Sequence, residues 1–265
     1  MSGRAPARIT VLGSGTSSGV PMIGCRCAVC TSSDPRDRRL RPSIFVSVPD
    51  RAAILVDTTP DFRQQALTYG ITRIDAVLFT HSHADHIFGL DDIRRFNFMQ
   101  GGPIPCHASA GTLSDIQRTF HYAFDGAARL GGGVPRIDTQ VITGPFTIGG
   151  VRVVPVPLWH GEAPVLGFRF GSFAYLTDCN RLDAAAWPLV EGVDTLVVDA
   201  LRDKPHTTHF TVAEALAVVE RVRPRRAYLT HMSHDLGHAA TNARLPGPVE
   251  LAYDGLVIDV DVDLG

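Results

Sequence analysis

Four potential metal-binding side chains lie within six residues of one another, directly after a short apolar run. The run Ala76–Phe79 is predicted to be a buried strand, and it leads into Thr80-His81-Ser82-His83-Ala84-Asp85-His86. Open α/β sheets place ligand sites at the carboxyl ends of their strands. Clustering three imidazoles and a carboxylate without a metal ion would be energetically costly. The segment therefore predicts an α/β fold with a site for two neighbouring cations at a strand end.

Short apolar runs rich in β-branched residues recur along the chain, with helical patterns between them. The other predicted strands are Ile9–Leu12, Ile44–Val48, Ala53–Val56, Val151–Val156, Phe168–Phe170, Ala174–Leu176, Thr195–Val198, Ala227–Leu229 and Leu256–Val260. The predicted helices are Asp61–Tyr69, Leu90–Phe98, Ser109–Phe120, Asp183–Leu189 and Val212–Val222. The last helix has a predicted capping box, with Thr211 as N-cap and Glu214 three residues on, and Pro224 prevents its continuation.

The length and composition indicate one globular domain. Of 265 residues, 45% are hydrophobic and 20% charged, which is enough apolar material for a substantial core. We see no linker, fixed-period repeat or low-complexity tract, so we predict a single domain over residues 1–265. Residues 100–150, with Gly131-Gly132-Gly133, are the least regular part and a candidate lid or insertion over the site.

The charge balance bears on partners and location. A net charge of −2 provides no global positive field for a long nucleic acid, so a small-molecule substrate is favoured. Two arginine clusters are interpreted as solvated faces: Arg36, Arg38, Arg39 and Arg41, and Arg221, Arg223, Arg225 and Arg226. We find neither a signal-peptide pattern nor an apolar run of about 18 residues, so we expect a cytoplasmic protein without a membrane contact. The sequence leaves open whether it forms a homodimer.

Cysteine spacing points to a second metal site. Three of the five cysteines lie in Cys25-Arg-Cys27-Ala-Val-Cys30. Neighbours this close cannot easily form disulfides with one another, and a reducing compartment would not keep them oxidised. Metal binding by thiolates is the natural alternative.

The segment His81-x-His83-x-Asp85-His86 resembles the HxHxDH signature of the metallo-β-lactamase superfamily. The resemblance implies a four-layer αββα sandwich, in which two mixed β-sheets are flanked by helices. It also implies two divalent ions, Zn or Mn, with the first two histidines on one ion and the Asp-His pair on the other. The remaining family ligands match three residues near the ends of later predicted strands, namely His160, the bridging Asp178 and His231. Asp57 resembles the family's aspartate that orients ligands by hydrogen bonding.

Within this superfamily, Gly19-Val-Pro21 followed by Gly24-Cys25-x-Cys27-x-x-Cys30 resembles the PhnP-type phosphoribosyl cyclic phosphate phosphodiesterases. That resemblance implies a structural zinc bound by Cys25, Cys27, Cys30 and a histidine, a closed Cys3His set. The fourth ligand would be His234, with His238 as a weaker competitor. His209 matches the histidine used near the leaving group, so His209 and Asp85 are the implied catalytic residues. His206 has no such counterpart and is either a substrate contact or a surface residue.

The resemblance implies a dinuclear phosphoric diester hydrolase. It would open a small cyclic phosphate of the 5-phosphoribosyl 1,2-cyclic phosphate type by attack of a metal-bridging hydroxide. A tRNA 3′-processing-type nuclease is disfavoured by the net charge and by the lack of a Lys-rich insertion. A thioester or lactone hydrolase shares the signature, but the cysteines disfavour a thioester hydrolase. A non-hydrolytic pyrroloquinoline quinone biosynthesis-type protein is disfavoured by the complete His and Asp set. The native metal and the natural substrate stay open.

Overall fold

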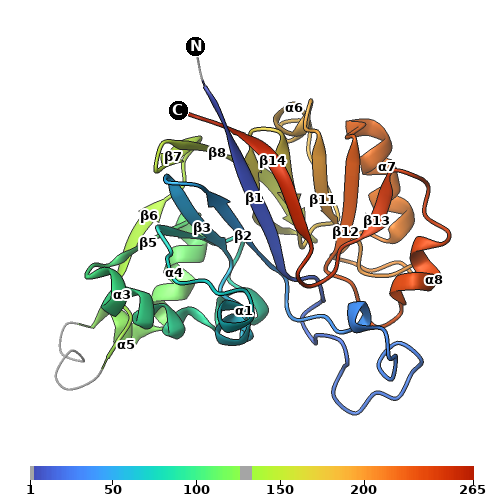
Figure 1. The fold of residues 1–265 in the computed structure, drawn as a ribbon, viewed down its shortest axis with the longest axis horizontal. Helices are drawn as coiled ribbons and strands as arrows, with labels where there is room; N and C mark the ends of the chain where they lie inside the picture. The colour runs from blue at the N-terminus through green and yellow to red at the C-terminus, as the bar shows by residue number, and fades with distance from the viewer. Residues whose placement is uncertain (1–2, 126–132) are drawn as a thin grey trace.

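The structure, a computed structural model, describes residues 3–125 and 133–265, where the chain forms two seven-stranded sheets (Figure 1). The first sheet has the order β14 (Val257–Asp263), β1 (Arg4–Gly13), β2 (Ser43–Val48), β3 (Ala52–Val56), β4 (Ala76–Leu78), β5 (Ile104–Ala108) and β6 (Ile137–Val141). The second has the order β13 (Val249–Leu251), β12 (Arg226–Thr230), β11 (Thr195–Asp199), β10 (Phe173–Leu176), β9 (Ala163–Phe170), β8 (Val151–His160) and β7 (Phe146–Ile148).

Helices cover the outer faces of both sheets (Figure 1). Those beside the first sheet are α1 (Phe62–Thr68), α2 (Ala84–Ile87), α3 (Arg94–Gln100), α4 (Ala110–Thr119) and α5 (His121–Phe124), and a 3-10 turn, η2 (Leu90–Ile93), precedes α3. Those beside the second sheet are α6 (Trp187–Val190), α7 (Val212–Val222) and α8 (His238–Asn242), and a short turn, η1 (Pro35–Asp37), lies in the segment between β1 and β2. The predicted αββα sandwich of two mixed sheets is confirmed.

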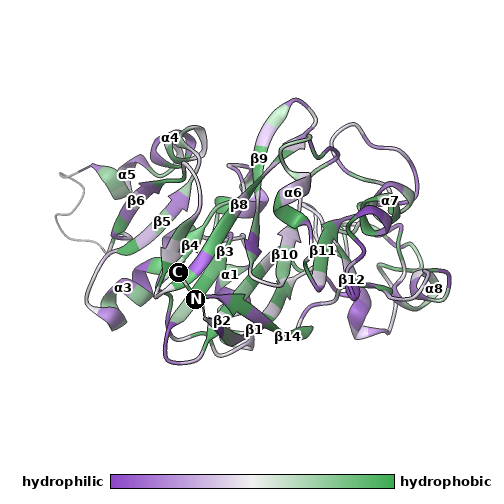
Figure 2. Cartoon of the chain, turned by 90° about the horizontal axis from the view of Figure 1, so that it is seen from above, coloured by the Kyte–Doolittle hydropathy of each residue, from purple (hydrophilic) through white to green (hydrophobic). Residues whose placement is uncertain are grey.

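The core follows from strands that are apolar on both faces. In β3, Ile54 and Val56 point into the layer between the sheets, whereas Leu55 points towards α1 and α3. Strands of parallel sheets that are covered on both sides have this near-continuous hydrophobic character. Figure 2 shows the apolar colour concentrated on the central strands and the hydrophilic colour mostly on the surrounding loops and helices.

Parallel pairing brings several strand ends to one edge of the sandwich. Strands β3 to β6 are parallel neighbours in the first sheet, and β10 to β13 are parallel neighbours in the second. Their carboxyl ends lead into polar loops, as the sequence predicts for β4 and its His-rich segment. The same edge receives the long segment between β1 and β2, drawn in blue below β12 and α8 in Figure 1.

Two sequence-based expectations need correction. Residues 183–189 are not one helix, because only Trp187–Val190 is helical. Pro188 has no N–H to continue a helix from Asp183 and is tolerated only in a first turn. Residues 100–125 and 133–150 are not an irregular insertion either, since β5, β6 and β7 with α4 and α5 make them part of the sandwich. Residues 126–132, with Gly131 and Gly132 of the predicted glycine run, lie outside the described residues.

Other local predictions are confirmed. Thr211 accepts from the Glu214 backbone N–H, and the Glu214 carboxylate accepts from the Thr211 backbone N–H, so α7 begins with the expected capping box. The helix spans Val212–Val222 as predicted. No helix within residues 3–125 and 133–265 is both long and apolar enough to cross a membrane.

Candidate metal centre

Among the described residues, four overlapping groups of potential ligands lie at the edge where the strands end; two contain the seven expected metal ligands, and the other two include His209. Within each group, one ligand atom per residue lies within 4.8 Å of the others. The first group is His81, His83 and His160, and the second is Asp85, His86, Asp178 and His231. All of these side chains except the exposed His83 are buried. The fold thus brings together seven residues that span positions 81 to 231 in the sequence.

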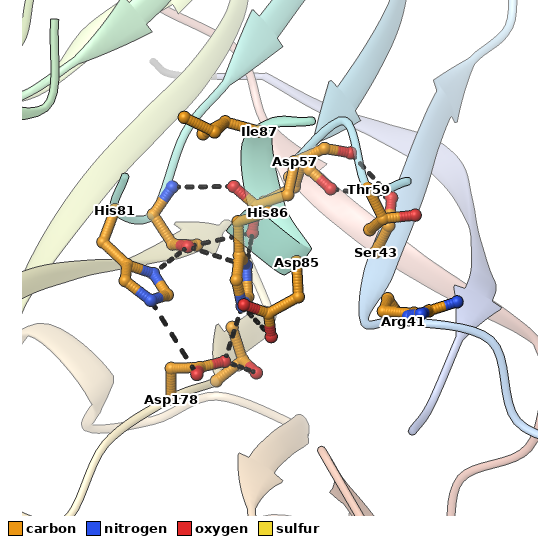
Figure 3. Close-up of polar contacts among 12 residues, drawn as sticks. Arg41, Ser43, Asp57, Thr59, His81, Asp85, His86, Ile87 and Asp178 are labelled. Carbon is orange, nitrogen blue, oxygen red and sulfur yellow. Dashed lines mark hydrogen bonds and ion pairs between the residues drawn. The ribbon is translucent and has the colours of Figure 1, made fainter. Parts of the chain in front are cut away.

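Asp178 belongs to the second group and also faces the first. Its Oδ1 is 3.9 Å from His81 Nε2, and its Oδ2 is 3.0 Å from His86 Nε2 and 3.1 Å from His231 Nε2. Figure 3 shows His81 and His86 directed towards this carboxylate, with Asp85 beside it. One oxygen faces each group, which is the arrangement that a carboxylate shared by two cations requires.

Sharp turns at the strand ends position these side chains. Asp57, Asp178 and His231 follow β3, β10 and β12 and have φ angles of 65°, 52° and 60°. Non-glycine residues rarely adopt this left-handed conformation, and they cluster at functional sites where the surrounding structure holds them. The edge therefore carries three strained residues that each turn a carboxylate or imidazole towards the site.

Asp57 orients one of the histidines. Its Oδ2 is 2.7 Å from His86 Nδ1 and accepts from the Thr80 hydroxyl at 2.9 Å, while Oδ1 accepts from the Thr80 backbone N–H at 2.9 Å (Figure 3). Complete burial raises the pKa of Asp57, although His86 and Thr80 favour its charged form. The contact directs His86 Nε2 away from Asp57 and into the second group, as expected of a residue that orients a ligand.

The electrostatics differ between the histidines. Burial lowers the pKa of His160 to about 4, so this ring is neutral at physiological pH. Burial also acts to lower the pKa of His231, but the Asp178 carboxylate outweighs it and raises the value to about 10. Burial opposes protonation of His86 as well, yet Asp178 and Asp57 raise its pKa well above the usual range. The carboxylates of the second group therefore strongly favour positive charge at this point.

Several ring nitrogens are buried without a hydrogen bond to any described residue. In the two ligand groups they are Nε2 of His81, His86 and His231, together with Nδ1 of His160 and His231, and outside these groups His238 Nδ1. Nε2 of His86 and of His231 lie near Asp178 Oδ2, at 3.0 and 3.1 Å, without a well-aligned hydrogen bond. Buried polar atoms in proteins are normally hydrogen-bonded, so each of these nitrogens requires an explanation. Imidazole nitrogens and carboxylate oxygens are the donors that Zn and Mn accept. The residues present thus fit two divalent cations.

Asp199 was missed in the sequence analysis. It is fully buried at the end of β11, with Oδ1 3.1 Å from His209 Nδ1 and Oδ2 accepting from the Phe210 backbone N–H at 2.9 Å. Its Oδ1 also accepts from the Asp178 backbone N–H at 3.2 Å. The available signal was an aspartate directly after the predicted strand Thr195–Val198.

His209 itself lies against the ligand groups. Its ring centroid is 4.6 Å from that of His231 and 4.7 Å from that of His160. His206 is exposed, and its ring centroid lies 5.1 Å from that of His209. Both histidines on this loop are therefore close to the candidate metal centre, with His206 farther towards solvent.

The cysteines form a separate group with His234. Cys25 Sγ and Cys27 Sγ each lie 3.3 Å from His234 Nδ1, and all four ligand atoms, with Cys30, lie within 4.8 Å of one another. Hydrogen bonding from the Cys30 backbone N–H lowers the pKa of Cys27 to about 6. His238, the competing residue, is instead paired with Asn242 at 3.0 Å. The geometry therefore favours His234 as the fourth member.

Arg39 is not part of a solvated face, which corrects the interpretation of the first arginine cluster. It is 1% exposed and donates to the carbonyls of Ser233 at 3.0 Å and Leu236 at 2.6 Å, while its partner carboxylate, Asp37, lies at 3.3 Å. These carbonyls flank His234 in the chain. The second cluster is exposed as predicted.

Comparisons with known proteins place the chain in a family. A family model described as the Beta-lactamase superfamily domain matches residues 52–232. A solved structure described as a new diphosphatase from the PhnP family is 44% identical, with a TM-score of 0.92, and covers 99% of this chain and 100% of that chain. Zn(2+)-bound PqqB from Methylobacterium extorquens, at 22% identity, 96% and 100% coverage and a TM-score of 0.74, shares the fold.

Two curated relatives differ in how much of them the chain covers. An octanoyltransferase from Porphyromonas gingivalis (strain ATCC BAA-308 / W83) is 35% identical over 259 residues, which are 96% of this chain and 52% of that protein. The chain thus spans about half the length of that relative. Coenzyme PQQ synthesis protein B from Methylobacterium nodulans is 31% identical over 218 residues, 71% of each protein.

Proposed function

Since the chain is a PhnP-type member of the metallo-β-lactamase superfamily, we propose that it is a dinuclear metal-dependent phosphoric diester hydrolase acting on a small molecule. The observation that carries the proposal is the presence of two ligand groups, with Asp178 belonging to the second and also facing the first. One cation would be held by His81, His83 and His160, the other by Asp85, His86 and His231, with Asp178 shared. A Cys3His zinc would occupy the group of Cys25, Cys27, Cys30 and His234. Asp85 would contribute to catalysis by holding the second cation.

The metal ions, when bound, lower the pKa of water and stabilise negative charge on phosphoryl oxygens. In the reaction, a water oxygen forms a bond to phosphorus and the bond from phosphorus to the leaving oxygen breaks. The leaving oxygen then needs a proton. We assign that proton to Nε2 of His209, because Asp199 Oδ1 occupies the other ring nitrogen, Nδ1, at 3.1 Å.

The first candidate substrate is a small cyclic phosphate of the 5-phosphoribosyl 1,2-cyclic phosphate type, which would be opened to a monoester. A second candidate is a diphosphate linkage, favoured by the 44% identical PhnP-family diphosphatase that covers 99% of this chain. Both reactions transfer a phosphoryl group to water and need the same residues. A net charge of −2 supports a small substrate over a long nucleic acid.

The test is a hydrolysis assay on metal-reconstituted protein. The substrates are bis(p-nitrophenyl) phosphate, 5-phosphoribosyl 1,2-cyclic phosphate and a nucleoside diphosphate sugar, with an octanoyl thioester as the acyl comparison. We expect turnover of at least one phosphate substrate, its loss in His81→Ala, and about three metal ions per chain. Turnover of the thioester alone, or of nothing at full metal occupancy, would refute the phosphodiesterase proposal.

A further inference from the structure

His206 is the next imidazole outward from the candidate metal centre. Its ring lies 5.1 Å from that of His209, which in turn lies 4.6 Å from that of His231. His206 is exposed, whereas His209 is buried. A substrate whose leaving oxygen meets His209 would therefore extend past His206 on its way to solvent.

Within residues 3–125 and 133–265, the hydrogen bonds given for His206 involve Nδ1 and not Nε2. The Thr208 backbone N–H donates to His206 Nδ1 at 3.3 Å, so the neutral ring carries its proton on Nε2. The protonated ring also carries a proton there. In both states Nε2 is a hydrogen-bond donor, and it is suited to an anionic oxygen.

The loop that carries His206 is fixed from both sides. Asn180, two residues after Asp178, donates from Nδ2 to the Thr207 carbonyl at 2.8 Å and accepts from the Gly161 N–H at 3.0 Å. Gly161 has a φ of 63°, and a Cβ there would lie 3.0 Å from Thr208 Cγ2, so this close approach favours glycine. Hydrogen bonds thus connect the loop to the segments that follow His160 and Asp178.

Arginine contacts brace the start of the loop. The Arg202 guanidinium donates to the carbonyls of Lys204 and Pro205, each at 3.2 Å. A loop held in this way loses little conformational entropy when a ligand binds.

The charges of the loop favour an anion. Asp203 is the one acidic residue in positions 202–209, and its two oxygens accept from Arg244 at 2.9 and 2.8 Å. Arg202 and Lys204 contribute positive charge next to His206. Charge-assisted hydrogen bonds to phosphoryl oxygens are among the stronger polar contacts.

We propose that Arg202–His209 forms a subsite for a second phosphoryl group of the substrate, and that His206 contacts this group through Nε2. The inference rests on the proposed function and specifies the substrate further: the part beyond the leaving oxygen carries a phosphate, as the 5-phosphate of a ribosyl cyclic phosphate does. Arg202 and Asn180 are positioning residues for the loop.

The experiment compares two substrates that differ only in the distal phosphate, ribose 1,2-cyclic phosphate and 5-phosphoribosyl 1,2-cyclic phosphate. The metal-loaded wild type is expected to prefer the second. In His206→Ala, the ratio of the two kcat/KM values is expected to fall about tenfold, mainly through KM, because a hydrogen bond to a charged group is lost. His206→Gln, which retains an amide donor, is expected to restore part of the preference.

His121→Ala is the matched control, since His121 is an exposed histidine on α5 outside both ligand groups, and its ratio should equal that of the wild type. If the wild type hydrolyses both substrates and His206→Ala changes their ratio less than twofold, the subsite is wrong and the proposed function stands. If the wild type hydrolyses neither compound, the cyclic phosphate function and the subsite fall together.

Discussion

Arg39→Met is expected to destabilise the protein substantially and to weaken both candidate metal sites. The guanidinium is 1% exposed and bonded to the carbonyls of Ser233 and Leu236. The segment between β12 and α8 also carries His231, of the second ligand group, and His234, of the cysteine group. Removing the guanidinium would leave buried carbonyls unpaired and free this segment to move.

The magnitude follows from what remains after the substitution. Removing one partner of a buried ion pair costs about 3–5 kcal/mol, because the other charge stays buried and uncompensated. Here Asp37 keeps the His238 backbone N–H at 2.7 Å, which partly compensates the carboxylate. We therefore expect the lower end, about 3 kcal/mol. For a chain of this length, that corresponds to a fall in Tm of roughly 6–12 °C.

The assay is urea and thermal unfolding, run on EDTA-treated and on metal-loaded protein, with zinc release followed by a chromogenic chelator. Arg38→Met is the control, since Arg38 is exposed and adjacent, and it should change stability by less than about 0.5 kcal/mol. Arg39→Lys should be intermediate, since lysine keeps the charge but not the forked geometry. A loss below about 1 kcal/mol for Arg39→Met, or an equal loss in the control, would refute this reasoning.

Three further predictions concern single groups. Asp57→Asn should weaken metal binding or activity about 10–100-fold, because His86 loses its carboxylate partner, and unchanged affinity in calorimetric metal titration would contradict this. Burial raises the pKa of Asp254 to about 7, so between about pH 4 and 7 the folded state keeps a proton that the unfolded state releases. The free energy of unfolding should therefore fall as pH rises through that window. In Asp254→Asn, the free energy of unfolding measured with urea should fall less steeply with pH than in the wild type, by at most about 1.4 kcal/mol per pH unit. Parallel pH profiles for the two proteins would rule this out. Cys25→Ser should remove one metal ion per chain by elemental analysis, whereas the exposed Ser33→Ala should keep all of them.

Features that depend on neighbours in the chain could be predicted from the sequence. The ligands from His81 to His86 follow one strand within a few residues, so their spacing alone predicts a shared site. The α7 boundaries were equally readable, because a capping box at Thr211 and a proline at 224 act locally. The resemblance to a known superfamily then supplied the distant candidates His160, Asp178 and His231.

Which distant groups meet depends on long-range packing, and the structure was needed to see it. Asp199 and His209 lie 3.1 Å apart because the loop after β11 folds back to the end of that strand. From the sequence, Arg39 was expected to be exposed like its neighbours. It is buried because the segment after β12 packs over it. His234 was the expected fourth ligand of the cysteine group and His238 the weaker competitor, and the structure places His234, not His238, beside the thiols. Strands β5, β6, β7 and β13 were missed because their local strand preference is weak and pairing with neighbouring strands stabilises them, at a sheet edge for β6, β7 and β13. Local spacing fixes which residues can act together in one turn, whereas burial and long-range pairing depend on contacts that no short window of sequence contains.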